Sequence, residues 1–331
     1  TNGKKRPRWW SHKTCSTSSS VSRKAGAAYT ALGTPSFTRA YVRRKRSRLA
    51  AAALAFLLPA RGGFADGFAV AVKLAIALLF FLYGARLSTQ EALKGLTNWR
   101  LHGVILAFTF VAYPLIGLLA RPTTAFLSDE LYQGLLFMSL VPSTVQSSVA
   151  LTGVARGNVS GAVVAASVSS LVGVVATPLL VMWLMGAGNG VHIDASVFTD
   201  IALQLLLPFV LGQLAHNFVP RVGELAKSKA TKIVDRGSIW MVIYSAFSKG
   251  VVSGVWSNVS GWEIAFLVAF SCALVAAMLW LTRVVPELLR FSREDRFTIQ
   301  MCGTQKSLAT GLPMATVIFG GASLGVLIIP L

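Results

Sequence analysis

Residues 299–313 read IQMCGTQKSLATGLP, and they place Lys306 between a glutamine and a serine in a stretch that is otherwise apolar. The apolar stretch covers residues 297–320, so Lys306 lies near its middle. A charged side chain at the centre of a membrane span is costly, and it usually marks a functional site. The sequence must therefore explain both the apolar surroundings and the lysine within them.

The composition is that of a membrane protein. The chain is 54% hydrophobic and 13% charged, whereas soluble domains carry about 25% charged residues. Several apolar runs reach the ~20 residues that a helix needs to cross a bilayer. These features predict an all-α polytopic membrane protein. A membrane-embedded enzyme is disfavoured, because the spans offer almost no acidic residues for a catalytic cluster.

The net charge of +19 comes mostly from residues 1–48, which hold 13 of the 31 Lys and Arg and no acid. A nucleic-acid-binding function for the whole chain is therefore excluded. This Ser- and Thr-rich tail is expected to be disordered. It is typical of an organelle transit peptide, or it derives from a mis-assigned upstream exon. The first alternative indicates a plastid envelope. The second indicates the plasma membrane, which is the location that we favour.

Residues 49–331 are expected to form one transmembrane domain. The hydropathy pattern predicts ten segments, at 49–60, 67–85, 101–120, 132–153, 158–185, 197–219, 233–255, 262–282, 297–320 and 322–331. The first and last are shorter than a span, and we expect both to be truncated helices. Alternate loops, counted with their flanking residues, hold 13 and 2 Lys and Arg. By the positive-inside rule, the basic loops and both termini are cytoplasmic.

Two of the ten segments are interrupted by polar residues. In the fourth, Pro142 removes a backbone donor, and hydroxyl and amide side chains follow at once. In the ninth, Gly303 and Pro313 flank a polar run. We predict these three residues to be helix breaks. The predicted substrate- or ion-binding residues are Ser143, Gln146, Ser147, Ser148, Thr152, Thr304, Gln305, Lys306 and Ser307.

The interrupted segments are fourth and ninth, five apart among ten. This spacing predicts two inverted five-helix repeats, because an odd number of spans forces opposite orientations. In such transporters, paired broken helices form the binding site near the bilayer midplane.

Four stretches carry a family resemblance: VPSTVQSSVALTGVARGN (141–158), VVATPLLVMWL (174–184), LLLPFVLGQL (205–214) and CGTQKSLATGLPMATVIF (302–319). Together they resemble the bile acid:sodium symporter (SBF-like) family, in particular bacterial sodium-dependent transporters and their eukaryotic sodium/bile acid cotransporter relatives. The resemblance implies that segments 4 and 9 cross in a core of segments 3–5 and 8–10. It further implies a panel of segments 1, 2, 6 and 7.

The chain also departs from that family. The resemblance implies a glutamate at Met301 or Gln300 and an asparagine at Lys306, where sodium would bind. It further implies hydroxyl-bearing residues at Ala162 and Ala166. Without a carboxylate in these spans, a sodium ion would face the Lys306 ammonium in a low dielectric. Sodium coupling is therefore doubtful, and no metal or other cofactor is expected, because the Cys and His residues have no ligand spacing.

Three roles remain open for Lys306. Its ammonium replaces the coupling cation and neutralises the C-terminal dipoles of half-helices. Alternatively, it binds the carboxylate or sulfate of a substrate, or burial lets it release and carry a proton. A structural alternative is a lysine that snorkels to the surface.

The leading prediction is a secondary active transporter, a symporter-like protein that moves a small organic anion by alternating access. Its expected partners are that anionic solute and membrane lipid, with homo-oligomerisation left open. The alternative is a membrane regulator or scaffold of ion homeostasis that keeps the fold but transports nothing.

Overall fold

The computed structural model describes residues 50–51, 53–86, 98–186, 199, 202–226, 228–254 and 260–319. Every regular element within these ranges is a helix. The tail at 1–48 and the tenth expected segment at 322–331 lie outside the described residues. The first expected segment is represented by helical residues 53–57.

Among the described residues, four long helices are apolar enough to cross a membrane, and they match four of the expected segments. They span Gly62–Arg86 (α3), Trp99–Ala125, Val159–Met185 and Gly261–Leu288 (α14). The second is composite. It comprises α5 (Trp99–Ala107), a π-helical turn η2 (Phe108–Ala112), α6 (Tyr113–Leu119) and a 3-10 turn η3 (Arg121–Ala125). The third lies within α9 (Val159–Gly186).

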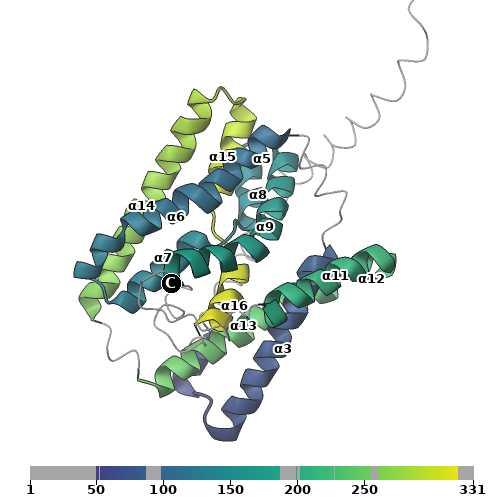
Figure 1. The fold of residues 1–331 in the computed structure, drawn as a ribbon, viewed down its shortest axis with the longest axis vertical. Helices are drawn as coiled ribbons and strands as arrows, with labels where there is room; N and C mark the ends of the chain where they lie inside the picture. The colour runs from purple at the N-terminus through teal and green to yellow at the C-terminus, as the bar shows by residue number, and fades with distance from the viewer. Residues whose placement is uncertain are drawn as a thin grey trace, which may run out of the picture.

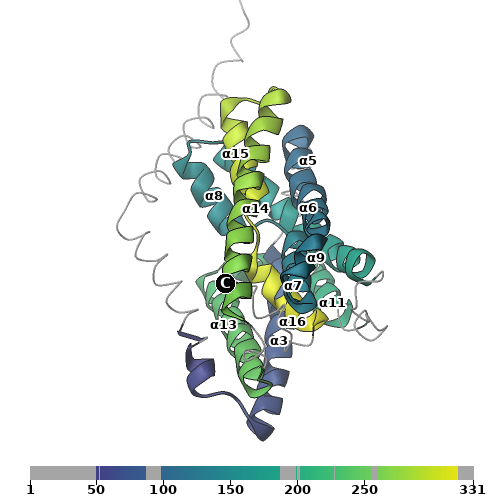
Figure 2. The ribbon, with the colours of Figure 1, turned by 90° about the vertical axis from the view of Figure 1, so that its left-hand side faces the viewer.

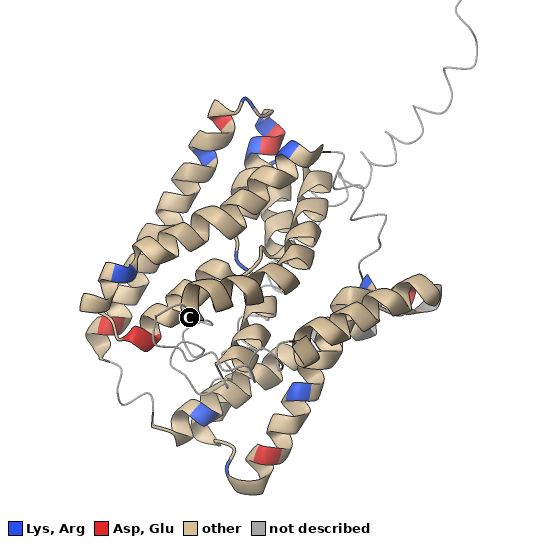
Figure 3. Cartoon of the chain, viewed as in Figure 1, with Lys and Arg blue, Asp and Glu red and all other residues tan. Residues whose placement is uncertain are grey.

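The remaining helices are shorter or less apolar. They are α7 (Asp129–Leu140), α8 (Val145–Val154), η4 (Ala202–Leu206), α11 (Leu207–Phe218), α12 (Pro220–Ala226), α13 (Lys229–Val252), α15 (Arg293–Thr304) and α16 (Leu308–Ile318). The short α12 and the π-helical turns η2 and η4 were not expected from the hydropathy pattern. The Lys and Arg residues of the described helices lie mostly near helix ends, as Figure 3 shows.

The helices form two groups (Figure 1). In one group, α3 packs against α11, α12 and α13. In the other, α14 packs on α15, and α15 packs on α5, α8 and α9. Figure 2 shows α7 and α16 between these groups, and α16 contacts α13. The two interrupted segments therefore lie where the groups meet.

Two glycines allow α3 and α11 to pack closely, as small residues do between membrane helices. A Cβ atom on Gly212 would lie 2.0 Å from the Phe81 carbonyl oxygen, and one on Gly84 would lie 2.0 Å from the Phe209 carbonyl oxygen. Backbone atoms cannot rotate away from such a clash. The contact therefore requires glycine on both helices.

We predict that Gly212→Ala destabilises the protein by roughly 1–3 kcal/mol through overpacking. Alanine is otherwise the better helix former by about 1 kcal/mol. Gly237→Ala on α13 is the matched control, because a Cβ atom there meets nothing within 4 Å. Thermal unfolding of the purified protein should show opposite signs for the two variants. Equal effects at both positions would contradict the packing argument.

Candidate functional site

The chain leaves the helical conformation between α7 and α8, at the proline that the sequence singled out. Val141 has ψ 146° and Thr144 has ψ 134°, so both are extended, and none of residues 141–144 is helical. Pro142 has no N–H, and proline disfavours a helical residue before it. Two half-helices therefore replace one continuous span, with Pro142 buried between them.

The second interruption falls between α15 and α16. Gln305 is extended, with φ −85° and ψ 130°, and the Ser307 hydroxyl caps α16 by accepting a 3.2 Å hydrogen bond from the Thr310 N–H. The predicted breaks at Gly303 and Pro313 need correction, because Gly303 lies in the last turn of α15 and α16 runs through Pro313. The break comprises residues 305–307. Membrane helices tolerate proline when neighbouring groups satisfy the freed backbone.

The two extended segments contact each other directly. The Ser307 N–H donates to the Pro142 carbonyl at 2.8 Å. The Ser143 hydroxyl donates to the Cys302 carbonyl at 2.6 Å, and its N–H donates to the Ser169 hydroxyl at 3.0 Å. Residues more than 150 positions apart in sequence thus satisfy each other's backbone groups. The ends of all four half-helices meet at this crossing.

Lys306 lies within the crossing, and backbone oxygens bind its ammonium group. Its Nζ donates to the carbonyls of Thr109 at 2.9 Å, Ser139 at 2.8 Å and Val141 at 2.8 Å. It also lies 4.2 Å from the centroid of the Tyr113 ring, within range of a cation–π interaction. An ammonium has three N–H donors, so all of them are used. Lys306 is only partly exposed and does not snorkel to the surface.

Two of these carbonyls belong to the C-terminal end of α7. The last four carbonyls of a helix have no partner within it, and this end of the helix carries a partial negative charge. Lys306 satisfies Ser139 and Val141, and the Thr177 hydroxyl satisfies Leu140 at 2.9 Å. The lysine therefore supplies both hydrogen bonds and the positive charge that this end of α7 requires.

The third carbonyl is available because of the π-helical turn in the Trp99–Ala125 span. The Tyr113 N–H bonds to the carbonyl of Phe108 instead of that of Thr109. The next residue, Pro114, has no N–H to offer. The Thr109 carbonyl is thus left without a partner in its own helix, and it accepts a hydrogen bond from the Lys306 ammonium instead. π-Helical turns are frequent at functional sites.

Tyr113 contributes to the crossing in a second way. Its hydroxyl donates to the carbonyl of Thr304, the last residue of α15, at 2.8 Å. The Thr304 hydroxyl itself donates to Gln300 at 2.7 Å within the helix. Tyr113 therefore links the end of α15 to the helix that holds Lys306. The sequence did not predict Thr109, Tyr113 and Ser139 as site residues. Pro114 was a usable signal, because a proline within an apolar span leaves a backbone carbonyl of its helix free.

The other predicted site residues differ in their burial. Ser148 and Thr152 are fully buried on α8, and the Ser148 hydroxyl lies 3.4 Å from that of Ser143. Ser147 and Gln305 are partly exposed, and their side chains make no hydrogen bond to the residues that the structure describes. Gln146 lies in the first turn of α8, and its side chain is outside the described part.

The helices that form the crossing carry their carboxylates at the ends that are remote from it. The acids of α7 and α15 are Asp129, Glu130, Glu294 and Asp295, all in first turns. Gln300 donates to the Leu279 carbonyl of α14 at 3.2 Å, away from Lys306. Within the described residues, no group of three or more His, Cys, Asp or Glu could hold a metal. A cation bound here would have neutral oxygen ligands.

The chain is similar in sequence to known membrane transport proteins. Residues 48–331 match the SBF-like CPA transporter family (DUF4137). The uncharacterized protein PA2026 of Pseudomonas aeruginosa is 44% identical over 284 residues, 86% of this chain and 85% of that protein. YfeH of Escherichia coli, whose name proposes a symporter, is 40% identical over 84% of this chain and 83% of its own length. Sodium/bile acid cotransporter 7 of Danio rerio is 28% identical over 75% of this chain and 74% of its own length.

We predict that Tyr113→Phe destabilises the protein by about 1–3 kcal/mol, because it leaves the buried Thr304 carbonyl unsatisfied. The phenyl ring keeps its place over Lys306, so Tyr113→Leu should cost more by also removing the cation–π contact. Thermal unfolding measures both variants. Tyr132→Phe on α7 is the control, because its hydroxyl makes a weaker 3.3 Å bond. Equal stability of Tyr113→Phe and the parent would show that the Thr304 bond contributes nothing.

Proposed function

The chain belongs to the SBF-like CPA transporter family and is an integral membrane protein, and from this we propose a secondary active transporter that carries a small organic anion by alternating access. The relatives named by function are a proposed symporter and a cotransporter, not enzymes. The plasma membrane is the proposed location.

The observation that carries the proposal is the coordination of Lys306 by three carbonyls from two helices. Half-helix ends at mid-membrane are the usual ion and substrate sites of inverted-repeat transporters. Here an ammonium fixed to the chain occupies a cluster of oxygens that would suit a monovalent cation. Of the three roles open to Lys306, this geometry favours the replacement of a coupling cation.

The same geometry argues against direct binding of the substrate by Lys306, because all three of its N–H groups already have acceptors. The Ser147 hydroxyl and the Gln305 amide are partly exposed and without partners among the described residues. We propose that these two groups bind the substrate. The fixed charge of Lys306 favours an anion nearby, because charges interact strongly in a site of low dielectric.

Alternating access would use the two helix groups of the fold. The group of α5, α8, α9, α14 and α15 would be the core, and the group of α3, α11, α12 and α13 would be the panel. In this proposal the full domain contains two inverted five-helix repeats. The core then rocks against the panel around the crossing, as in transporters with broken helices.

The proposed transport does not use sodium at the crossing. A sodium ion would have to displace the ammonium or lie beside it, and the helices of the crossing offer no nearby carboxylate to offset the repulsion. We predict that uptake of small carboxylates and sulfonates into proteoliposomes is unchanged when potassium replaces sodium. A tenfold or greater dependence on sodium would overturn this part of the proposal.

Removing the lysine tests its role more directly. Lys306→Ala should lower uptake about 100-fold, because charge-assisted hydrogen bonds contribute roughly 1.5–3 kcal/mol each. It also leaves space beside three unpaired carbonyls. External ammonium or methylammonium should therefore restore uptake at least tenfold. Lys306→Met fills that space and should not be rescued. Lys73→Ala, an exposed lysine of α3, should transport normally. Normal uptake by Lys306→Ala would contradict the proposed role of Lys306 in transport.

Ser147→Ala and Gln305→Ala should raise the KM for the transported anion about tenfold with little change in thermal stability, because their side chains make no bond to described residues. Ser160→Ala, on the exposed start of α9, is the control. The regulator or scaffold alternative predicts a different result. The protein would bind and transport no anion, and cells that carry Ser147→Ala or Gln305→Ala would behave like cells that carry the parent protein.

A further inference from the structure

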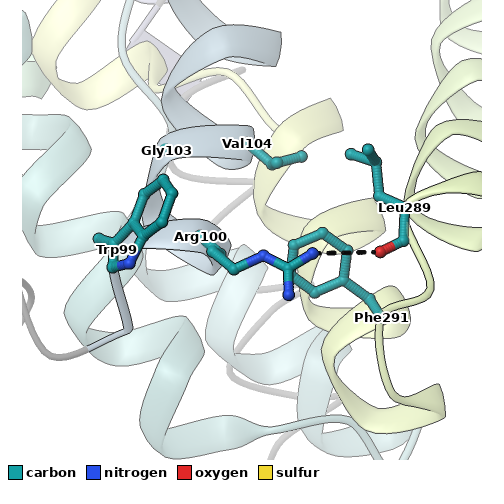
Figure 4. A pocket seen from close by; sticks show the side chains of 6 residues that line it. All are labelled: Trp99, Arg100, Gly103, Val104, Leu289 and Phe291. Carbon is teal, nitrogen blue, oxygen red and sulfur yellow. Dashed lines mark hydrogen bonds between the residues drawn. The ribbon is translucent and has the colours of Figure 1, made fainter.

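A second candidate site lies at the end of the α5 helix that is remote from the crossing. A cleft of about 220 Å³ lies between α5 and the connection from α14 to α15, and Figure 4 shows the residues that line it. Its lining is mostly apolar, and one charged side chain, Arg100, extends across it. The residues that line the cleft are Trp99, Arg100, Gly103, Val104, Leu289 and Phe291.

The Arg100 guanidinium has most of its hydrogen-bonding capacity free. Its Nη2 donates to the Leu289 carbonyl at 3.4 Å, and its Cζ lies 5.4 Å from the centroid of the Phe291 ring. It forms no ion pair within the described part of the chain. A guanidinium has five N–H donors in a planar fork that matches a phosphate. The cleft therefore combines an apolar wall with a cation that is suited to phosphate and that no described carboxylate neutralises.

The cleft lies where a membrane surface is expected. Trp99 begins the apolar span Trp99–Ala125 and is 71% exposed, as is typical of tryptophan at the boundary between membrane and water. Arg100 and Leu289 lie at the ends of two expected spans whose connecting loops belong to the basic set, and these loops are therefore predicted to be cytoplasmic. Anionic phospholipids concentrate in that leaflet, and basic pockets between membrane helices bind their headgroups.

The size of the cleft distinguishes a lipid from a soluble ligand. Sites that enclose a small molecule usually have volumes of roughly 300–1,000 Å³, and this cleft has only about 220 Å³. A soluble ligand would stay largely exposed there. A phospholipid needs only its phosphate and part of one chain held, because the rest of the chain stays in the bilayer.

We infer that this cleft binds an anionic phospholipid, with its phosphate on Arg100 and the start of an acyl chain against Val104 and Leu289. The lipid would join α5 to the α14–α15 connection. The span that begins with α5 supplies Thr109 and Tyr113 to Lys306, and α15 leads directly to that lysine. Bound lipid should therefore stabilise the protein.

The test measures thermal unfolding of the full-length protein in nanodiscs of phosphatidylcholine with increasing phosphatidylglycerol. We expect phosphatidylglycerol to raise Tm by about 2–4 °C, the shift that roughly 1 kcal/mol produces in a domain of 150–250 residues. Inorganic phosphate added to pure phosphatidylcholine nanodiscs should produce no shift, because it lacks the acyl chain. This arm separates a lipid site from a simple phosphate site.

Two variants remove different parts of the site. Arg100→Gln removes the charge, and it should raise the half-maximal phosphatidylglycerol fraction about tenfold. Gly103→Leu fills the cleft, and it should have a similar effect. A Cβ atom on Gly103 meets nothing within 4 Å, so this variant should fold normally. Arg283→Gln removes an exposed arginine of α14 outside the cleft, and it should respond like the parent.

The inference holds if the shift requires phosphatidylglycerol, survives in Arg283→Gln and weakens in both cleft variants. It fails if phosphatidylcholine alone gives the full stability, if inorganic phosphate reproduces the shift, or if both cleft variants respond like the parent. These readouts are independent of transport, so the lipid site and the proposed function can fail separately.

Discussion

The structure depends on the interaction between one ammonium group and three backbone carbonyls. A broken helix inside a membrane exposes backbone groups that water cannot satisfy, and each unsatisfied group costs several kcal/mol. At the end of α7, Lys306 satisfies Ser139 and Val141, Thr177 satisfies Leu140, and the Ser307 N–H satisfies Pro142. The break is stable because other segments provide these donors.

This arrangement makes the two interruptions dependent on each other. The break between α15 and α16 supplies Lys306 and Ser307 to the first break, and the first break supplies Ser143 to the Cys302 carbonyl. Neither half-helix pair could be satisfied in this way alone. A change in the relative position of the two segments would expose several polar groups together. Such coupling favours discrete arrangements over gradual deformation, and this is compatible with the alternating access that we propose.

Much of this was predictable from local sequence. Pro142 followed by hydroxyl residues indicated the first break, and the polar run around Lys306 indicated the second. The structure shows Lys306 in the interruption between α15 and α16. The predicted limits of the second break were wrong, because Gly303 and Pro313 are both helix-weakening residues but lie inside helices. Residues 322–331, which complete the expected ten segments, lie outside the described part.

By itself, the sequence determined the membrane class, most helix positions and the cost of placing a lysine at mid-span. These follow from composition and periodicity, which are local. The partners of Lys306 were decided by tertiary structure, because they are backbone carbonyls that every residue possesses and that no side-chain pattern reveals. Thr109 became a partner only because a π-helical turn and Pro114 left its carbonyl free. Which oxygens surround the ammonium depends on how three distant helices pack, and that is a property of the fold.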